Sequence, residues 1–423
     1  MHSEWRIFPI QEVAVLSKRK ILIYFAAVGV TACAGSPELD RDKTLERNLA
    51  QMANRPGATQ LNWRQPKERV PGAAVIADVA PSRSFPAQEA LNRALRYSKA
   101  RQGRGIMVWY DGDVVAENFD DGISANTPFA AYSMHKTVLS LVLLAAIEDG
   151  YVDSLDTPVG QYLSKWRNDE RGNITLRDLL THTSGLAHYG VQTRQAQMIN
   201  FSGRMRDAAL SYPLVKSPGT EFQYNNVNSL VLGIALSQAL QAHGLHYASY
   251  LGKRLWRPMG NRDAKLWRDS LEQDGVPRFH SGLEAGLADW LNVGVMLVNR
   301  GVTANKTRVL SNESIDNLTT PSAINPAYGL HLWLGLGDQW QPRRSYGPNS
   351  ALGAIHSEPF LADDVWFLDG FGGQRVYAVP SASLVVARFG EIDFEYDDAA
   401  IVNMLLRGLS NSEHAGSQPK PLH

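Results

Sequence analysis

The sequence contains a single cysteine, and this scarcity excludes several kinds of structure. One cysteine can form neither a disulfide within the chain nor a cluster of thiolate metal ligands. Basic and acidic side chains number 42 each, so the chain has no cationic excess for nucleic-acid phosphates and no acidic excess typical of disorder. The motifs H-E-x-x-H and G-x-S-x-G and the phosphate-binding glycine loop are also missing. We therefore expect no nucleic-acid partner, no metal and no other cofactor.

The first 33 residues have the pattern of an export signal. The basic cluster K-R-K at residues 18–20 precedes an apolar run over residues 21–30, which is too short to span a bilayer comfortably. The run closes on V-T-A-C, which resembles a bacterial lipobox, and this resemblance implies lipidation of Cys33. Ala34 at the next position favours sorting to the outer membrane. We expect an exported bacterial lipoprotein on the periplasmic face of a membrane.

The alternative interpretation is an incidental cysteine that follows an uncleaved apolar anchor. In both cases the body of the protein lies outside the cytoplasm.

The rest of the chain divides by composition. Residues 34–84 are polar, are interrupted by prolines and lack sustained periodicity, which predicts a tether and an N-terminal wrapping segment. Compact structure is expected from residue 85 onward. We assign residues 85–423 to one domain, in which residues 85–130 and 325–410 form an α/β part and residues 131–324 form a mostly helical part.

Hydrophobic periodicity predicts an α+β fold. Two strand-like runs flank Asp111-Gly112, a dipeptide that favours the positive φ angles of a tight hairpin, and a second hairpin surrounds residues 380–383. An antiparallel sheet built from the two ends of the chain, flanked by helices and with a helical region inserted, is the simplest architecture. Helical spacing is found at residues 86–101, 136–149, 176–180, 228–242, 287–299 and 396–409.

Ser133 and Lys136 form an S-x-x-K motif at the start of an apolar helical pattern. Residues three apart on a helix share a face, so the lysine can lie beside the serine hydroxyl. A serine becomes nucleophilic when an adjacent base takes its proton, and a desolvated lysine can be that base. The motif alone is weak, because a helix-capping serine with a solvated lysine gives the same pattern. Equal matches occur at Ser17 and at Ser417.

Four ordered segments supply the missing context. They are FAAYSMHK at residues 129–136, ITLRDLLTHTSGL at residues 174–186, YNN at residues 224–226 and GFGGQ at residues 370–374. In this order they resemble the signatures of the class C β-lactamase-like serine hydrolases. That family includes class C β-lactamases, D-alanyl-D-alanine carboxypeptidases, family VIII esterases and 6-aminohexanoate-dimer hydrolases. The resemblance implies a β-lactamase/transpeptidase-like fold.

The resemblance also implies roles for individual residues. Ser133 would form the acyl-enzyme, and Lys136 would share the proton with Tyr224, whose pKa we expect to be lowered by the lysine ammonium. Asn226 would orient Lys136 and contact the substrate.

The oxyanion of the tetrahedral intermediate needs two N–H donors. The amide of Ser133 would be one, and Phe371 would supply the other directly after Gly370. The family usually has Lys-Thr-Gly or His-Thr-Gly in the segment where this chain has Leu368-Asp369-Gly370. Because the carboxylate of Asp369 would repel a substrate carboxylate, we expect a neutral or cationic ester or amide.

Three further side chains attract attention. Trp333 could line an acyl pocket, although core packing is the commoner role of a tryptophan. His182 lies in a segment that is a structural turn in the family, and His135 should point away from the face that Ser133 and Lys136 share.

We therefore predict a serine hydrolase that cleaves small ester or amide bonds through an acyl-Ser133 intermediate. A D-Ala-D-Ala peptidase or β-lactamase of the same family is one alternative. The other is a catalytically inactive, membrane-tethered binding protein with the same fold.

Overall fold

The computed structural model describes residues 40–74, 81–335, 340–351 and 353–416. The export signal and Cys33 lie outside the described residues. Among the helices within these ranges, none is both long enough and apolar enough to cross a membrane.

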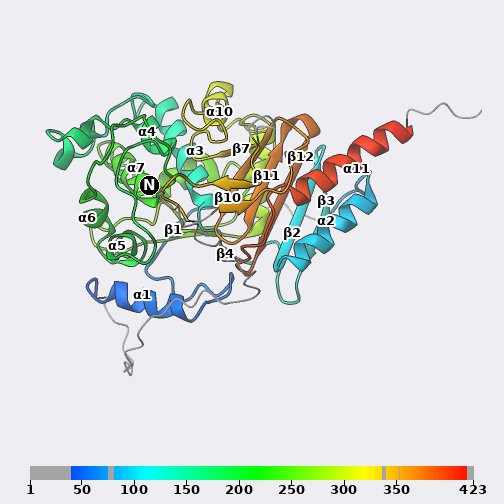
Figure 1. Cartoon of the computed structure of the whole chain (residues 1–423), viewed down its shortest axis with the longest axis horizontal. Helices are drawn as coiled ribbons and strands as arrows, with labels where there is room; N and C mark the ends of the chain where they lie inside the picture. The colour runs from blue at the N-terminus through cyan, green and yellow to red at the C-terminus, as the bar shows by residue number, and fades with distance from the viewer. Residues whose placement is uncertain (1–39, 75–80, 336–339, 352, 417–423) are drawn as a thin grey trace, which may run out of the picture.

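A large antiparallel sheet forms the centre of the molecule, as Figure 1 shows. Its two halves come from the two ends of the described chain, as the sequence predicts. Helices α2 (Gln88–Ala100) and α11 (Ala400–Gly416) pack together on its outer face, and α9 (Leu287–Val298) packs on β2, β11 and β12 from the inserted region. In spatial order the strands are β3 (Asp113–Phe119), β2 (Gly103–Tyr110), β12 (Leu384–Gly390), β11 (Gln374–Val379), β10 (Val365–Gly370) and β7 (Trp333–Gly335).

The two predicted hairpins form at the expected residues. Asp111 and Gly112 have φ angles of 47° and 99°, the left-handed conformation that joins β2 to β3. A short 3₁₀ turn, η6 (Pro380–Ala382), joins β11 to β12, and Ser383 closes it at φ 44°. These local signals therefore set the register of both hairpins.

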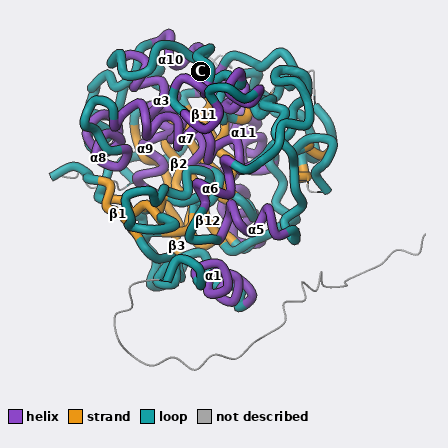
Figure 2. Tube along the Cα trace, turned by 90° about the vertical axis from the view of Figure 1, so that its left-hand side faces the viewer, coloured by secondary structure: helices purple, strands orange, loops and turns teal. Residues whose placement is uncertain are grey.

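The inserted region is mostly helical, and two of its strands join two earlier strands in one small antiparallel sheet. Figure 2 shows the strands near the centre of the body with helices around them. The small sheet has the order β1 (Lys67–Val70), β5 (Ala264–Trp267), β6 (Leu283–Ala285) and β4 (Phe129–Ala130). A separate two-stranded ribbon pairs β8 (Arg343–Ser345) with β9 (Gly353–Ile355).

The other α-helices are α1 (Thr44–Ala53), α3 (Met134–Glu148), α4 (Leu176–Leu180), α5 (Arg194–Phe201), α6 (Met205–Leu210), α7 (Asn226–Gln241), α8 (Tyr247–Leu251) and α10 (Asn312–Thr319). The shorter helical turns are η1 (Val159–Gln161), η2 (Ser164–Trp166), η3 (Glu170–Asn173) and η4 (Gly252–Trp256).

Part of the segment predicted as a tether and N-terminal wrapping segment is ordered against the body, so compact structure begins before residue 85. Helix α1 packs on α5, where the Asn48 amide donates to the Phe201 carbonyl at 2.8 Å, and β1 pairs with β5. Arg41 continues this attachment by donating to the Gly203 carbonyl at 2.7 Å. The partners that hold this segment lie more than 150 residues away in sequence.

Helix α3 runs through the interior, and every residue from Met134 to Ala146 is buried. It packs against α7, α10 and the strands β10 and β11, so its first turn lies between the helical region and the large sheet. This position takes the residues near Ser133 out of bulk water. The closing helix α11 starts at Ala400, later than the predicted residue 396, and the Asp398 carboxylate just before it is held between two arginines.

Candidate active site

Ser133 and Lys136 face each other at the start of α3. Ser133 occupies the N-cap position, yet its hydroxyl caps no backbone group. Instead the Ser133 Oγ accepts a hydrogen bond from the Lys136 Nζ at 2.8 Å. Only 1% of the Lys136 side chain is exposed. A capping serine with a solvated lysine is therefore not what the structure contains.

The Lys136 amine is buried and has three hydrogen-bond acceptors. Besides Ser133, it donates to the Asn226 Oδ1 at 2.8 Å and to the His280 carbonyl at 3.2 Å. Burial lowers the pKa of Lys136 to about 7, because desolvation penalises the ammonium form, and the negative charge of Asp369 opposes this shift. A substantial share of Lys136 is consequently neutral near pH 7 and able to accept a proton.

The turn that precedes α7 fixes Asn226. Asn225 caps this helix by accepting from the Val227 amide at 3.4 Å, and its own side-chain amide donates to the Ala187 carbonyl at 2.8 Å. The Asn226 side chain donates to the Asn200 Oδ1 at 2.9 Å, which leaves its carbonyl oxygen toward Lys136. Nothing in the sequence indicated Asn200 as the residue that orients Asn226.

Tyr224 lies directly over the lysine. The Lys136 Nζ is 4.8 Å from the centre of the Tyr224 ring, and the Ser133 side chain is near enough to the Tyr224 hydroxyl to influence its pKa. The expectation of a lowered Tyr224 pKa is wrong. Burial raises that pKa well above its usual value, the charge of Asp369 raises it further, and the Ser133 side chain acts in the opposite direction. Tyr224 is therefore a neutral phenol that can donate a proton.

His182 supports Tyr224 from behind. Its ring centre lies 4.4 Å from that of Tyr224, and its Nδ1 accepts hydrogen bonds from the Asn225 amide at 3.3 Å and from the Asn228 side chain at 2.9 Å. Burial holds the pKa of His182 well below its ordinary value, so the ring is neutral. The structure thus places His182 in a positioning role.

Trp333 also lies behind Tyr224. The two rings stack with their centres 6.0 Å apart and an angle of 24° between them, and only 2% of Trp333 is exposed. The Arg344 guanidinium is 4.0 Å from the centre of the Trp333 ring. Trp333 is therefore packed in the core and does not line an open acyl pocket.

The proposed oxyanion donors come from two elements that lie against each other. Gly370 ends β10, and a Cβ on this glycine would lie 2.4 Å from the carbonyl oxygen of Ala131, two residues before Ser133. Phe371 follows in the turn to β11, with its ring centre 5.8 Å from that of Tyr132. The close contact places the residue before Phe371 against the segment that leads into Ser133.

Asp369 does not face the site as a free charge. Its carboxylate is 2.9 Å from Arg344 and 2.5 Å from Arg375, and it accepts a hydrogen bond from the Tyr346 hydroxyl at 2.7 Å. Asp398 completes the group, at 2.8 Å from Arg344 and 2.7 Å from Arg375. Two buried carboxylates thus balance two buried guanidinium groups. The expected repulsion of a substrate carboxylate by Asp369 is therefore largely cancelled.

The arginines of this network were not expected from the sequence, although one of them has a local signal. Asp369 and Arg375 lie directly opposite each other across the β10–β11 hairpin. An opposite-charge pair at that register is a recognisable pattern. Arg344 and Asp398 come from distant segments, so no short-range sequence pattern predicts their contact.

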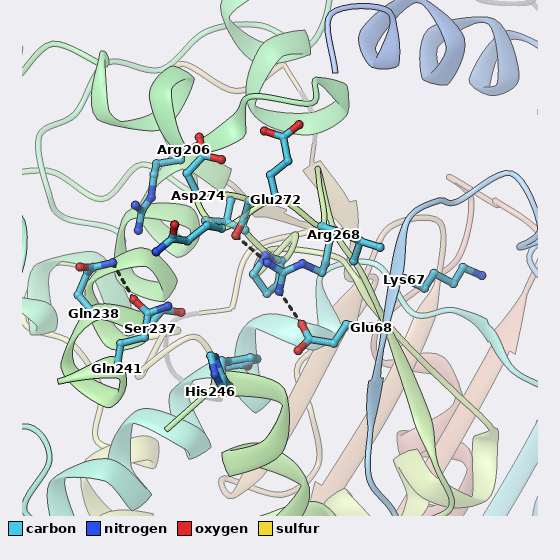
Figure 3. Close-up of a pocket in the computed structure, with 16 residues that line it drawn as sticks. Lys67, Glu68, Arg206, Ser237, Gln238, Gln241, His246, Arg268, Glu272 and Asp274 are labelled. Atoms are coloured by element: carbon cyan, nitrogen blue, oxygen red, sulfur yellow. Dashed lines mark hydrogen bonds and ion pairs between the residues drawn. The ribbon is translucent and has the colours of Figure 1, made fainter. Parts of the chain in front are cut away.

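One large cavity lies elsewhere in the described structure. Its volume is about 1060 Å³. The Glu68–Arg268 pair belongs to its lining, which Figure 3 shows. No predicted site residue lines it. One lining residue, Tyr247, reaches the His135 Nε2 through its hydroxyl at 3.3 Å, which confirms that His135 points away from the face of Ser133. Within the described ranges, no cluster of three or more His, Cys, Asp or Glu side chains is arranged to hold a metal ion.

Comparison with known sequences gives two findings. A family model described as Beta-lactamase matches residues 44–408. Esterase EstB from Burkholderia gladioli is 27% identical over 177 residues, which cover 37% of this chain and 43% of that esterase. The chain thus spans less than half of the length of this relative.

Comparison with solved structures finds the same fold. A Bacillus anthracis protein described as a candidate 6-aminohexanoate-dimer hydrolase superposes with a TM-score of 0.64 at 17% identity, covering 92% of this chain and 100% of that one. EstCE1, described as a hydrolase with promiscuous acyltransferase activity, has a TM-score of 0.56 at 15% identity and covers 77% of this chain and 98% of its own. At these identities the similarity concerns the fold alone.

Proposed function

This chain belongs to the beta-lactamase family and is a serine hydrolase, and from that premise we propose that it cleaves small ester or amide bonds through an acyl-Ser133 intermediate. Its α+β, β-lactamase/transpeptidase-like fold agrees with the prediction. The observation that carries the proposal is the hydrogen bond of 2.8 Å between the Ser133 Oγ and a buried Lys136.

In the first half of the proposed reaction, neutral Lys136 takes the proton of the Ser133 hydroxyl while the Oγ attacks the substrate carbonyl carbon. The negative charge that develops on the carbonyl oxygen is held by the amides of Ser133 and Phe371. Asn226 and the His280 carbonyl oxygen stabilise the ammonium group that forms on Lys136. The carbonyl π bond opens at this stage, and the proton remains on the lysine.

Collapse of the tetrahedral intermediate breaks the bond to the leaving group. Tyr224 donates a proton to the departing alcohol or amine and recovers one from Lys136, so the tyrosine returns to its neutral state. A water molecule then attacks the acyl-enzyme with Lys136 as the base, which releases the acid and regenerates Ser133. Because the pKa of Tyr224 is raised, its hydroxyl is protonated in the resting enzyme. This supports a role for Tyr224 as a proton donor, in preference to a role as a phenolate base.

The residues on strand β10 favour the ester or amide interpretation over the peptidase or β-lactamase alternative. The strand position that carries Lys or His in penicillin-directed members is occupied by Leu368, which is fully buried. The nearby cations Arg344 and Arg375 are already paired with Asp369 and Asp398, so neither is free to bind a substrate carboxylate. The similarity to esterase EstB points the same way.

The proposal is tested by intact-mass analysis and peptide mapping after exposure to a fluorophosphonate, p-nitrophenyl butyrate and a fluorescent penicillin. We expect turnover of the ester, fluorophosphonate mass on Ser133 and little penicillin adduct, and we expect Ser133→Ala to lose both turnover and label. A stable penicillin adduct on Ser133 would instead assign the chain to the peptidase side. A complete lack of turnover and adducts would leave the inactive binding protein as the conclusion.

We further propose that the chain is exported and held at a membrane by a lipid on Cys33. The lipobox-like V-T-A-C sequence after a basic and apolar segment supports this proposal. Cys33→Ser should release the protein from the membrane fraction or leave its signal uncleaved. Unchanged incorporation of a labelled fatty acid into this variant would refute lipidation at Cys33.

A further inference from the structure

Several large apolar side chains are exposed beside the nucleophile. Phe371, Ile392 and Phe394 have exposed fractions of 40%, 39% and 58%. The rings of Phe371 and Phe394 are 5.3 Å apart, and the ring of Tyr132 lies 5.8 Å from Phe371 on its other side. Ile392 lies against the same turn, because a Cβ on Gly372 would meet its atoms at 2.7–3.0 Å. We call Tyr132, Phe371, Ile392 and Phe394 the apolar ledge.

The backbone on both sides of the ledge is fastened in place. The Asp393 amide donates to the Gly372 carbonyl at 3.1 Å, which ties the loop that carries Ile392 and Phe394 to the turn that carries Phe371. The Glu391 carboxylate accepts from the Ala58 amide at 3.0 Å and from Arg104 at 2.8 Å. The ledge therefore exists before a substrate binds, and little conformational entropy would be lost when it is covered.

Most of the charge near the ledge is paired. Glu391 is paired with Arg104, and the Asp393 carboxylate lies 3.8 Å from Arg101. Glu395, which follows Phe394, is exposed to solvent. An apolar surface binds hydrocarbon better than it binds a charged group.

The position of the ledge relative to the reacting atoms decides which part of a substrate reaches it. Tyr132 directly precedes Ser133, with a positive φ of 49°, and Phe371 carries the proposed second oxyanion donor. The leaving group must meet Tyr224, which is packed in a different aromatic group with Trp333 and Tyr346. The acyl group of the tetrahedral intermediate is then directed to the side of Tyr132 and Phe371.

We propose that the apolar ledge binds the hydrocarbon part of the acyl group, so that the preferred substrates are esters or amides of medium-chain or aromatic carboxylic acids. This inference rests on the proposed function, which it deepens by naming the acyl class. Each methylene that covers the ledge removes apolar surface from water, and this should raise kcat/KM by roughly twofold to fourfold per methylene.

The test is a series of p-nitrophenyl esters from acetate to octanoate, hydrolysed by the full chain and by Phe394→Ala. The wild type should show kcat/KM rising with acyl length. Phe394→Ala should lose about tenfold with octanoate and less than twofold with acetate, since truncation removes ring surface that only the longer chain covers. Leu361→Ala is the matched control, because Leu361 is similarly exposed at 52% and is not part of the ledge. Its acyl-length profile should equal that of the wild type.

Three outcomes would overturn the inference. A flat acyl-length profile in an enzyme that hydrolyses acetate would leave the proposed function standing and remove the ledge as an acyl site. A profile that follows the length of the alcohol instead, in a matched series of acetate esters, would assign the ledge to the leaving group. An effect of Phe394→Ala on vesicle binding or self-association, with an unchanged profile, would identify a membrane or a second copy as the occupant. Absence of any Ser133-dependent turnover would instead count against the proposed function.

Discussion

Gly370 and Ala131 approach so closely that a Cβ on the glycine would lie 2.4 Å from the carbonyl oxygen of Ala131. The contact joins the end of β10 to the turn that leads into Ser133. Because one of the two proposed oxyanion amides follows Gly370 and the other belongs to Ser133, this contact sets their separation. Any side chain larger than hydrogen at position 370 would prevent this contact.

Gly370→Ala should consequently impair catalysis more than folding. The methyl group must push β10 away from Ala131, and the loss of one aligned oxyanion donor costs about 10²–10³ in kcat. Overpacking should lower the free energy of unfolding by about 1–3 kcal/mol. Ester turnover and urea unfolding provide the two measurements. Gly190→Ala is the control, since a Cβ there meets nothing nearer than 3.8 Å, and both quantities should stay close to wild type.

The pH dependence of ester hydrolysis should report on Lys136. The base acts when neutral, and burial lowers its pKa to about 7. We expect kcat/KM to fall about tenfold per pH unit well below pH 7 and to level off above it. A profile measured with an uncharged ester from pH 5 to 9 tests this. A single rise near pH 10 would show that Lys136 has the pKa of an ordinary lysine.

The same group should make folding depend on pH. An unfolded lysine titrates near 10.4, about three units above folded Lys136, so between these values the unfolded chain binds more protons. The free energy of unfolding should therefore rise with pH from about 7 to about 10, by at most about 1.4 kcal/mol per unit from this residue. Lys136→Met should remove that part of the slope in urea unfolding at pH 7, 8 and 9. Identical slopes in both proteins would contradict burial of a neutral amine.

Tyr224→Phe should separate proton donation from packing. The substitution keeps the ring that stacks on Trp333 and removes the hydroxyl that lies near Ser133. Loss of a general acid lowers turnover by about 10²–10⁴. The loss should be smaller for esters with good leaving groups such as p-nitrophenol, which depart without a proton. Equal losses for alkyl and p-nitrophenyl esters would indicate that the hydroxyl only orients Ser133.

Asp369→Asn should affect both stability and the pH profile. It leaves Arg344 and Arg375 buried with one carboxylate fewer, and breaking such a pair costs about 3–5 kcal/mol. Because the charge of Asp369 raises the Lys136 pKa, its removal should move the activity profile to lower pH. Asp42→Asn, which breaks an exposed pair with Arg204, should change stability by less than about 1 kcal/mol and leave the profile in place. A destabilised Asp369→Asn with an unmoved profile would refute the electrostatic coupling.

The sequence predicted the features that depend on short-range interactions. The Asp111-Gly112 hairpin follows from two residues that accept positive φ angles, and the large sheet follows from alternating apolar runs at both ends of the chain. Helical spacing allows the contact between Ser133 and Lys136, and the neighbouring family-like segments singled it out from two equal matches. In each case the residues that determine the structure are neighbours in the chain.

The sequence was less informative where a property depends on distant partners. Helix α1 is held by α5, more than 150 residues away in sequence, so its own pattern gave no indication of where it packs. Arg344 and Asp398 meet from different elements to neutralise Asp369 and Arg375. A carboxylate that appears free in the sequence is therefore paired in the fold.

The sequence by itself determined which groups are available for chemistry: a serine, a lysine at helical spacing, and a tyrosine and glycine in recognisable segments. Only the tertiary structure decided their protonation states and orientation. Burial among distant segments leaves Lys136 partly neutral, keeps Tyr224 a neutral phenol and places Trp333 behind that ring instead of in a pocket. The physical reason is that desolvation and charge pairing depend on everything packed around a group, whereas spacing along a helix depends only on the helix.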